Sequence, residues 1–186
     1  MKPIGGMALI DLIVERVKQS DHYNHKTQNL MIATTVEAED DLLAHYCLSK
    51  GYKVFRGSEA DVLQRFAQIV RHFEPQIIVR LTGDNPFIDP VLLSKMLEKH
   101  RQEKADYTYT AGTPLGISGE MIDAQILSEI DNFPLRSQSV SMSRSISESI
   151  LSNFTCNYSH RPKNLHILLI DSRLIQKKIM CLRPVY

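Results

Sequence analysis

The sequence lacks tryptophan, contains three cysteines, carries a net charge of only +1 and has no long apolar run. Cys47, Cys156 and Cys181 are odd in number and far apart, which favours buried thiols in a reducing cytoplasm over a disulfide framework or a zinc site. The near-neutral charge, without a basic run, argues against nucleic acid as a partner. No apolar stretch approaches the roughly 20 residues of a membrane span, so we expect no membrane partner. These absences predict one soluble cytoplasmic domain over residues 1–186.

Helical and extended patterns alternate along the first two-thirds of the chain. Helices are predicted over residues 9–17, 37–49, 59–73 and 90–103, and strands over residues 30–34, 52–55, 77–81 and 107–110. Asp89 and Pro90 suit the N-cap and the first turn of the fourth helix. Strands separated by helices of roughly 10–15 residues predict a mostly parallel sheet with helices on both faces. The predicted fold class is α/β, a Rossmann-like three-layer α/β/α domain.

The segment Thr82-Gly83-Asp84-Asn85-Pro86 directly follows the apolar run at residues 77–81. A buried strand with this ending delivers one carboxylate to the carboxyl edge of the sheet, where open α/β sheets bind ligands. Asp84 is therefore a candidate for holding a hard cation that carries phosphate oxygens. The alternative is that Asp84 only caps a turn, as Asp before Asn-Pro often does. The motif alone leaves both interpretations open.

A second polar segment, residues 56–65, follows the predicted strand at residues 52–55. Gly57 permits a close backbone approach and Ser58 suits a helix cap, while Asp61 and Arg65 fall one turn apart on one helix face. One interpretation is a nucleotide site, because a helix N-terminus binds anions through its free N–H groups. The other is a capping box of Ser58 with Asp61 plus an exposed ion pair between Asp61 and Arg65. The two are compatible.

Four segments of the chain together resemble a known family. They are Lys2-Pro3-Ile4-Gly5-Gly6, Ala33-Thr34-Thr35, residues 55–66 and Val79-Arg80-Leu81-Thr82-Gly83-Asp84-Asn85-Pro86. In this order and spacing they resemble the spore-coat polysaccharide protein F group of the acylneuraminate cytidylyltransferase family, from Lys2 to about Ile130. The resemblance implies a nucleotide-diphospho-sugar transferase (glycosyltransferase-A-like) fold. It also implies Mg²⁺-dependent transfer of CMP from CTP to a sugar or sugar acid, with release of pyrophosphate, in surface polysaccharide biosynthesis.

The resemblance also implies a role for particular residues. Asp84 and Lys2 would be catalytic, and Asp84 would hold the metal together with Asp171, the last residue of an apolar run at residues 165–171. Asn85 and Glu120 would lie near the sugar. The nucleotide pocket would be lined by Ser58, Asp61, Arg65, Thr82 and Gly83. CTP and a small sugar or sugar acid are the implied partners, and the resemblance allows for a homodimer.

The chain departs from the family in two places. It begins at Met1, where family members have already passed a first strand and a loop rich in Gly, Ser, Arg and Lys that cradles the triphosphate. We therefore expect a fold without that strand and phosphate loop, with exposed apolar edges at the centre of the sheet and no nucleotidyl transfer by this chain. The alternatives to an enzyme are a non-catalytic fragment and a Rossmann-like binding or interaction module whose exposed strand edge pairs with another chain.

The second departure is the segment 137–155, where serine occupies every odd position from Ser137 to Ser149. This alternation forms no apolar face at either the helical or the strand period. Our hypothesis is a frame-shifted remnant of family sequence, and the alternative is an ordinary serine-rich linker. Residues 156–186 are predicted to hold a last strand and a helix.

Overall fold

The computed structural model describes residues 3–24, 26, 29–110, 112–114, 116–131 and 166–171. Lys2, the serine-rich segment 137–155 and the predicted C-terminal helix lie outside the described residues. In chain order the elements are β1 (Pro3–Ile4), β2 (Met7–Ala8), α1 (Leu9–Lys18), β3 (Leu30–Thr35), the 3₁₀ turn η1 (Ala38–Asp40), α2 (Asp41–Ser49), β4 (Lys53–Gly57), α3 (Val62–Phe73), β5 (Ile77–Thr82), α4 (Pro90–Glu103), β6 (Tyr107–Thr108), β7 (Glu120–Asp123), α5 (Ala124–Asp131) and β8 (His166–Asp171).

Six strands form one sheet in the order β4-β3-β8-β5-β7-β6. The first four are parallel, whereas β7 and β6 run antiparallel to their neighbours. This confirms the prediction of a mostly parallel sheet. The expectation of exposed edges at its centre is wrong, because β8 lies between β3 and β5 and pairs with both. The apolar run of β8 thereby satisfies two rows of backbone hydrogen-bonding groups that an open slot would leave unpaired.

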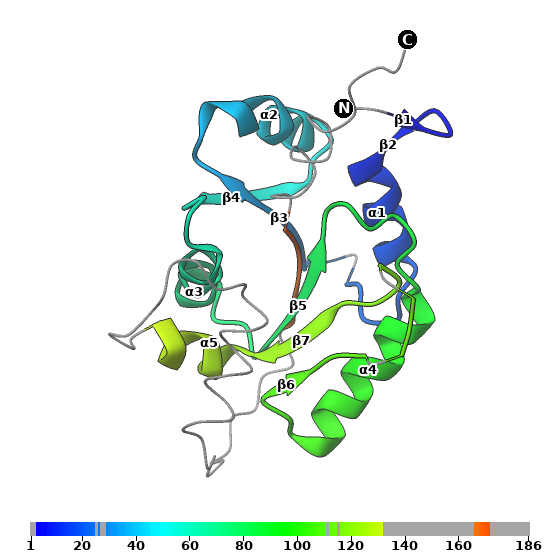
Figure 1. Cartoon of the computed structure of the whole chain (residues 1–186), viewed down its shortest axis with the longest axis vertical. Helices are drawn as coiled ribbons and strands as arrows, with labels where there is room; N and C mark the ends of the chain where they lie inside the picture. The colour runs from blue at the N-terminus through cyan, green and yellow to red at the C-terminus, as the bar shows by residue number, and fades with distance from the viewer. Residues whose placement is uncertain are drawn as a thin grey trace.

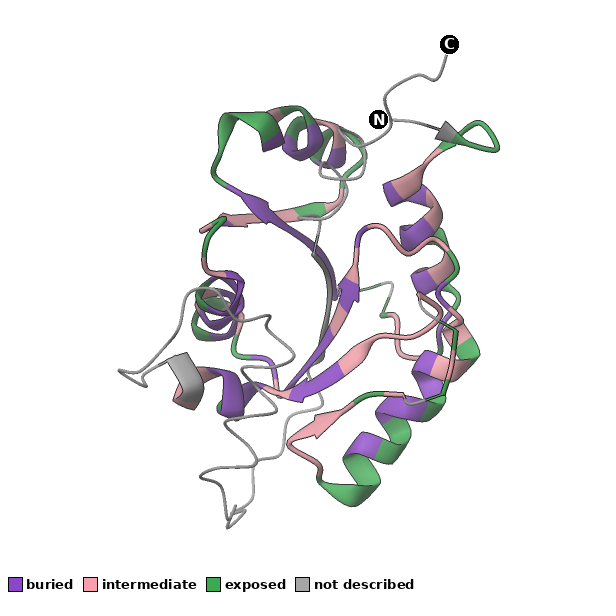
Figure 2. Cartoon of the chain, in the orientation of Figure 1, coloured by how far each residue is buried: buried purple, intermediate pink, exposed green. Residues whose placement is uncertain are grey.

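Helices cover both faces of this sheet, as predicted (Figure 1). The core on one face packs the apolar stripes of α1, α2 and α4 against alternate residues of β3 and β5, including Ile32, Val79 and Leu81. The core on the other face packs α3 and α5 against the intervening residues, including Ala33 and Ile78. Figure 2 shows both helix layers buried toward the sheet and exposed away from it. No helix among the described residues is long and apolar enough to cross a membrane.

Helix α4 begins at the predicted residue, whereas helix α3 begins later than predicted. Asp89 caps α4 as predicted, since its carboxylate accepts the backbone N–H groups of Val91 and Leu92, with Pro90 in the first turn. Helix α3 begins at Val62 rather than at residue 59, and its cap is Asp61. Ser58 is therefore not the helix cap that the predicted capping box requires, although its Oγ accepts the N–H of Asp61, one of the hydrogen bonds of such a box. Ser58 and Asp61 are both good caps, and the chain uses the later one.

Four elements, the strands β1, β2 and β7 and the helix α5, had no prediction from the sequence. Gly5 and Gly6 both have positive φ angles, of 59° and 83°, and they join β1 to β2 in a tight hairpin. Strand β7 and helix α5 follow a loop that crosses the carboxyl end of β5. Gly119 allows this close crossing, because a Cβ at Gly119 would lie 2.8 Å from the carbonyl oxygen of Arg80.

Candidate nucleotide and metal site

The four parallel strands all end at one edge of the sheet, and the polar segments singled out in the sequence follow three of them. Thr35 at the end of β3 pairs with Gly57 at the end of β4. Asp171 at the end of β8 is in register with Ala33 on one side and Thr82 on the other. The carboxyl edge of a parallel sheet is where open α/β folds bind ligands. The fold thus brings the segment after β4, the segment after β5 and the end of β8 to one edge.

Arg65 lies fully buried beneath the turn that links β4 to α3, with 0% of its surface exposed. Its Nη1 donates to the carbonyl oxygen of Ser58 at 2.9 Å. Its aliphatic stem lies over Gly57, where an added Cβ would come within 2.8 Å of the Arg65 Cγ. The expectation of an exposed ion pair with Asp61 is therefore wrong on exposure, because the missing side chain at Gly57 makes room for the arginine to fold inward.

Ser58 and Asp61 close the same turn through hydrogen bonds to the backbone. The Ser58 Oγ accepts the N–H of Asp61 at 3.1 Å, and the Asp61 carboxylate accepts the N–H of Gln64 at 2.9 Å. Both side chains are partly exposed. Of the predicted nucleotide-binding residues in this segment, Ser58 and Asp61 therefore reach the surface, whereas Arg65 supports the turn from below.

Two charged residues, buried Asp40 and partly buried Arg56, hold the ends of β3 and β4. Neither of them was assigned a role from the sequence. Asp40, 6% exposed, accepts hydrogen bonds from the hydroxyls of Thr34 and Thr35 and from the Thr35 N–H. Arg56 donates through Nε to the carbonyl of Thr35 at 2.7 Å and through Nη2 to the carbonyl of Glu37 at 2.9 Å. The sequence signal for such contacts is a pair of adjacent threonines followed by an acidic residue five positions later. The same sequence position also fits an acidic residue in the first turn of a helix, so the signal is ambiguous.

The loop after β5 is fixed by Asn85. The Asn85 Nδ2 donates to the hydroxyl of Thr82, and its N–H donates to the Thr82 carbonyl at 3.2 Å. Gly116, with a φ of 89°, lies against the Asn85 amide so closely that a Cβ there would stand 2.7 Å from Oδ1. Gly83 is buried and Asp84 is partly buried between these anchors. The structure thus brings Thr82, Gly83, Asp84 and Asn85 together at the end of β5.

Glu120, predicted to lie near the sugar, begins β7 directly opposite Arg80 on β5. The two side chains form an ion pair of 2.8 Å between Arg80 Nη1 and Glu120 Oε2, with 10% and 21% of their surfaces exposed. The carboxylate therefore has a structural partner across the two strands. Its register partner Arg80 lies two residues before the end of β5, so Glu120 is near the strand end that Asn85 follows.

Of the two acidic residues that the resemblance implies as metal ligands, Asp171 ends β8 and Asp84 lies in the loop after the neighbouring strand β5. Asp84 follows Thr82 by two residues, and Thr82 is the register partner of Asp171. Oxygen donors of this kind suit a hard cation such as Mg²⁺, which takes one or two carboxylates and completes its shell with water and substrate phosphates. Within the described ranges no group of three His, Cys, Asp or Glu side chains forms a closed metal cage. A two-carboxylate site fits that pattern.

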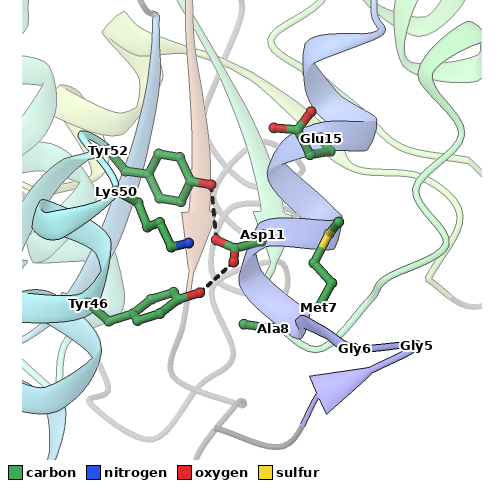
Figure 3. A pocket seen from close by; sticks show the side chains of 9 residues that line it. All are labelled: Gly5, Gly6, Met7, Ala8, Asp11, Glu15, Tyr46, Lys50 and Tyr52. Atoms are coloured by element: carbon green, nitrogen blue, oxygen red, sulfur yellow. Dashed lines mark hydrogen bonds between the residues drawn. The ribbon is translucent and has the colours of Figure 1, made fainter.

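A separate cleft of about 510 Å³ lies between the β1–β2 hairpin, α1 and α2 and contains none of the predicted site residues (Figure 3). At its floor Asp11 accepts the hydroxyls of Tyr46 and Tyr52 at 2.5 and 3.0 Å. The hydrogen bond to Asp11 raises the pKa of Tyr46 to about 12, and burial together with the same bond raises the pKa of Tyr52. Both hydroxyls therefore stay protonated at neutral pH. Tyr46 ties α1 to α2, and Tyr52 ties α1 to the turn before β4.

Comparison with known proteins identifies relatives of this chain. A cytidylyltransferase family model matches residues 1–154. The chain is 45% identical over 130 residues to the spore coat polysaccharide biosynthesis protein SpsF of Bacillus subtilis, covering 70% of this chain and 54% of the relative. It is 36% identical over 118 residues to an uncharacterized protein of Methanocaldococcus jannaschii, covering 63% of this chain and 47% of the relative. The chain thus spans about half the length of these curated relatives.

Two solved structures share the fold. A cytidylyltransferase from Leptospira borgpetersenii superposes with a TM-score of 0.64 at 28% identity, over 73% of this chain and 57% of that chain. A CMP:2-keto-3-deoxy-manno-octonic acid synthetase complexed with CTP superposes with a TM-score of 0.59 at 13% identity, over 96% of this chain and 88% of that chain. The second likeness shows the fold alone, the nucleotide-sugar transferase fold that the sequence predicts. The chain belongs to the cytidylyltransferase family.

Proposed function

We propose that the chain acts in the transfer of CMP from CTP to a sugar or sugar acid for surface polysaccharide biosynthesis in the cytoplasm. One observation carries the proposal. The register of the sheet sets Asp171 beside Thr82, so that Asp84, two residues past the end of β5, follows the parallel strand next to the one that ends in Asp171. The name of the Bacillus subtilis relative supports the polysaccharide context, and the solved synthetase complexed with CTP supports the nucleotide.

The proposed roles follow from where the side chains lie. Asp84 and Asp171 would hold a divalent cation, for which we propose Mg²⁺, and the cation when bound would neutralise charge on the phosphates. Ser58, Asp61, Thr82 and Gly83 would form the nucleotide pocket. Arg65 would serve that pocket indirectly, because it holds the carbonyl of Ser58 from the buried side of the turn.

The remaining proposed roles concern the sugar and the phosphates. Asn85 and Glu120 would face the sugar, while each also keeps a structural partner, Thr82 and Arg80 respectively. Lys2 would act on the phosphates as a cation. The protein's contribution to phosphoryl transfer is chiefly positioning and charge neutralisation, so this fixed arrangement of polar groups is what the reaction needs. We propose further that residues 1–186 form a single nucleotidyltransferase-like domain.

The test of the metal assignment is CTP binding by isothermal titration calorimetry, with and without Mg²⁺. Asp84→Asn should abolish the Mg²⁺-dependent part of the affinity, because a neutral amide does not offset the charge of the cation. Glu103→Gln is the matched control, since Glu103 is an exposed carboxylate at the end of α4. Equal Mg²⁺-dependent affinity in Asp84→Asn and the wild type would remove Asp84 from the site.

The test of the transfer activity is pyrophosphate release from CTP with a panel of sugars and sugar acids. The CMP:2-keto-3-deoxy-manno-octonic acid synthetase, assayed with CTP and 2-keto-3-deoxy-manno-octonic acid, provides the positive control. Turnover by the 186-residue chain would support the enzyme. CTP binding without pyrophosphate release would support the alternative proposal, a nucleotide-binding chain that does not catalyse transfer.

A further inference from the structure

Asp40 occupies the N-cap position of α2, but its carboxylate does not cap that helix. The side chain turns instead toward the end of β3, where its Oδ2 accepts three hydrogen bonds. The hydroxyls of Thr34 and Thr35 donate at 2.6 Å each, and the N–H of Thr35 donates at 2.9 Å. An acidic residue in this position normally serves its own helix. Here a buried carboxylate is committed to the strand end next door.

The residue that Asp40 holds most firmly, Thr35, is the register partner of Gly57. The N–H of Val36 donates to the carbonyl of Gly57 at 3.0 Å, and Arg56 Nε donates to the carbonyl of Thr35 at 2.7 Å. Asp40 therefore holds the hydroxyl and the N–H of Thr35, and Arg56 of β4 holds its carbonyl. Strand β4 leads directly into the turn at Gly57 and Ser58. Hydrogen bonds to an ionised carboxylate are shorter and stronger than neutral ones, which suits a fixed point.

Gly57 passes this constraint to the turn itself. The stem of Arg65 lies against Gly57, and its guanidinium holds the carbonyl of Ser58 at 2.9 Å. A continuous series of contacts thus runs from Asp40 through Thr35 and Gly57 to Ser58. Asp40 stands at the far end of this series and is itself only 6% exposed.

We propose that Asp40 is a positioning residue for the nucleotide pocket, setting the Gly57–Ser58 turn through Thr35. The proposal rests on the proposed function, in which Ser58 lines the pocket. Asp40 does not contact the nucleotide. It fixes the end of β3, and the paired end of β4 carries the turn into place.

Three variants test the proposal by CTP titration in the full chain, at a temperature where urea or thermal unfolding shows each to be folded. Asp40→Asn keeps the shape but weakens all three hydrogen bonds, and should raise the Kd for CTP by roughly three- to tenfold, the affinity equivalent of one net hydrogen bond. Thr35→Val and Thr34→Val each delete one hydroxyl donor to the same oxygen. Thr35→Val should weaken CTP binding by a similar factor, and Thr34→Val should leave it within about twofold.

The pair of threonine variants separates positioning from stability. Each removes one buried hydrogen bond to Asp40, and Thr35→Val also removes the longer bond of 3.3 Å that the Thr35 hydroxyl accepts from the Glu37 N–H. A purely structural role therefore predicts a somewhat larger loss of stability in Thr35→Val and an unchanged Kd in both. A Kd that rises for Thr35→Val but not for Thr34→Val supports positioning, even if Asp40→Asn fails to fold. Unchanged CTP affinity in folded Asp40→Asn or Thr35→Val, with a wild type that binds CTP, overturns this inference alone. A wild type that does not bind CTP with Mg²⁺ present overturns the proposed function and the inference with it.

Discussion

The β3–β4 end and the β5–β7 end of the sheet carry the two halves of the candidate site, and they are held by different means. At the β3–β4 end, buried or partly buried charged side chains form hydrogen bonds with the backbone. Asp40, Arg56 and Arg65 together bind the main chain of residues 35, 37 and 58. At the β5–β7 end, Gly116 lies against the side chain of Asn85 and Gly119 lies against the backbone of Arg80, and one ion pair joins the two strands.

This contrast predicts opposite sensitivities. The β3–β4 end depends on what its side chains supply, so deleting a side chain should damage it most. The β5–β7 end depends on space left empty, so adding a single methyl group should damage it most. The β3–β4 end would then keep the turn at Gly57 and Ser58 rigid, while the β5–β7 end keeps the Asp84 loop close to the strand that begins at Glu120.

The largest expected effect comes from deletion at the β3–β4 end. Arg65→Ala should lower the free energy of unfolding by about 3–4 kcal/mol, because it leaves the Ser58 carbonyl without its charged donor and opens a void beneath Gly57. Urea unfolding measures this loss. Arg71→Ala, an exposed arginine on the same helix, is the control and should cost less than about 1 kcal/mol. A loss below about 1 kcal/mol in Arg65→Ala would show that the turn does not depend on this side chain.

The next effect comes from addition at the β5–β7 end. Gly116 and Gly112 both have positive φ angles, of 89° and 74°, but only Gly116 has a side chain, that of Asn85, where its Cβ would stand. Alanine at either position should pay a similar conformational cost. Gly116→Ala should cost about 1–2 kcal/mol more than Gly112→Ala through the collision with Asn85.

A double-mutant cycle isolates that collision. Combining Gly116→Ala with Asn85→Ala should recover most of the excess loss, because the second change removes the atoms that the new Cβ meets. Strict additivity of the two changes would mean that the loop before β7 does not pack on Asn85. The contrast between the two ends of the sheet would then depend only on the effect of side-chain deletion at the β3–β4 end.

Local pattern was enough to predict much of the fold. The apolar runs at β3, β5 and β8 and the apolar stripe of α3 are local sequence patterns. The residues of that stripe, Val62, Leu63, Phe66, Ile69 and Val70, are all buried. Strand β7 escaped prediction because it is only four residues long and polar at both ends. The place of β8 between β3 and β5 depends on pairing between segments more than 80 residues apart, which no local pattern specifies.

Within the candidate site, sequence reasoning found the segments but not their inner supports. The polar residues after β4 and β5 were predictable because turn chemistry at strand ends is local. The burial of Arg65 was not, since it depends on Gly57 being in the facing strand and not on helical spacing. Asp40 was missed because its donors, Thr34 and Thr35, lie on another element, while its sequence position is that of a helix cap.

The smallest expected effect is a dependence of local stability on pH, confined to the antiparallel strands β6 and β7. His100 on α4 is 2% exposed, and its Nδ1 lies 2.9 Å from the Thr108 hydroxyl on β6. Burial lowers the pKa of His100 from its ordinary value of 6.5, opposed by the nearby charge of Asp123 and helped by that of Arg101. The neutral ring is therefore the form that the folded state holds.

The sign of the effect follows from this lowered pKa. Below about pH 6.5 the unfolded chain binds a proton that the folded chain does not, so the His100 contribution to stability is present above that pH and is lost as the pH falls. We expect a loss of up to about 1 kcal/mol between pH 6.5 and pH 5.

Hydrogen exchange, corrected for intrinsic rates, should show amides of β6 and β7 losing protection over this range while those of β3 and β4 change less. His100→Asn should remove the difference, because the amide does not titrate. Equal loss of protection in both halves of the sheet would assign the pH dependence to other groups, and the antiparallel side would then have no acid sensitivity of its own.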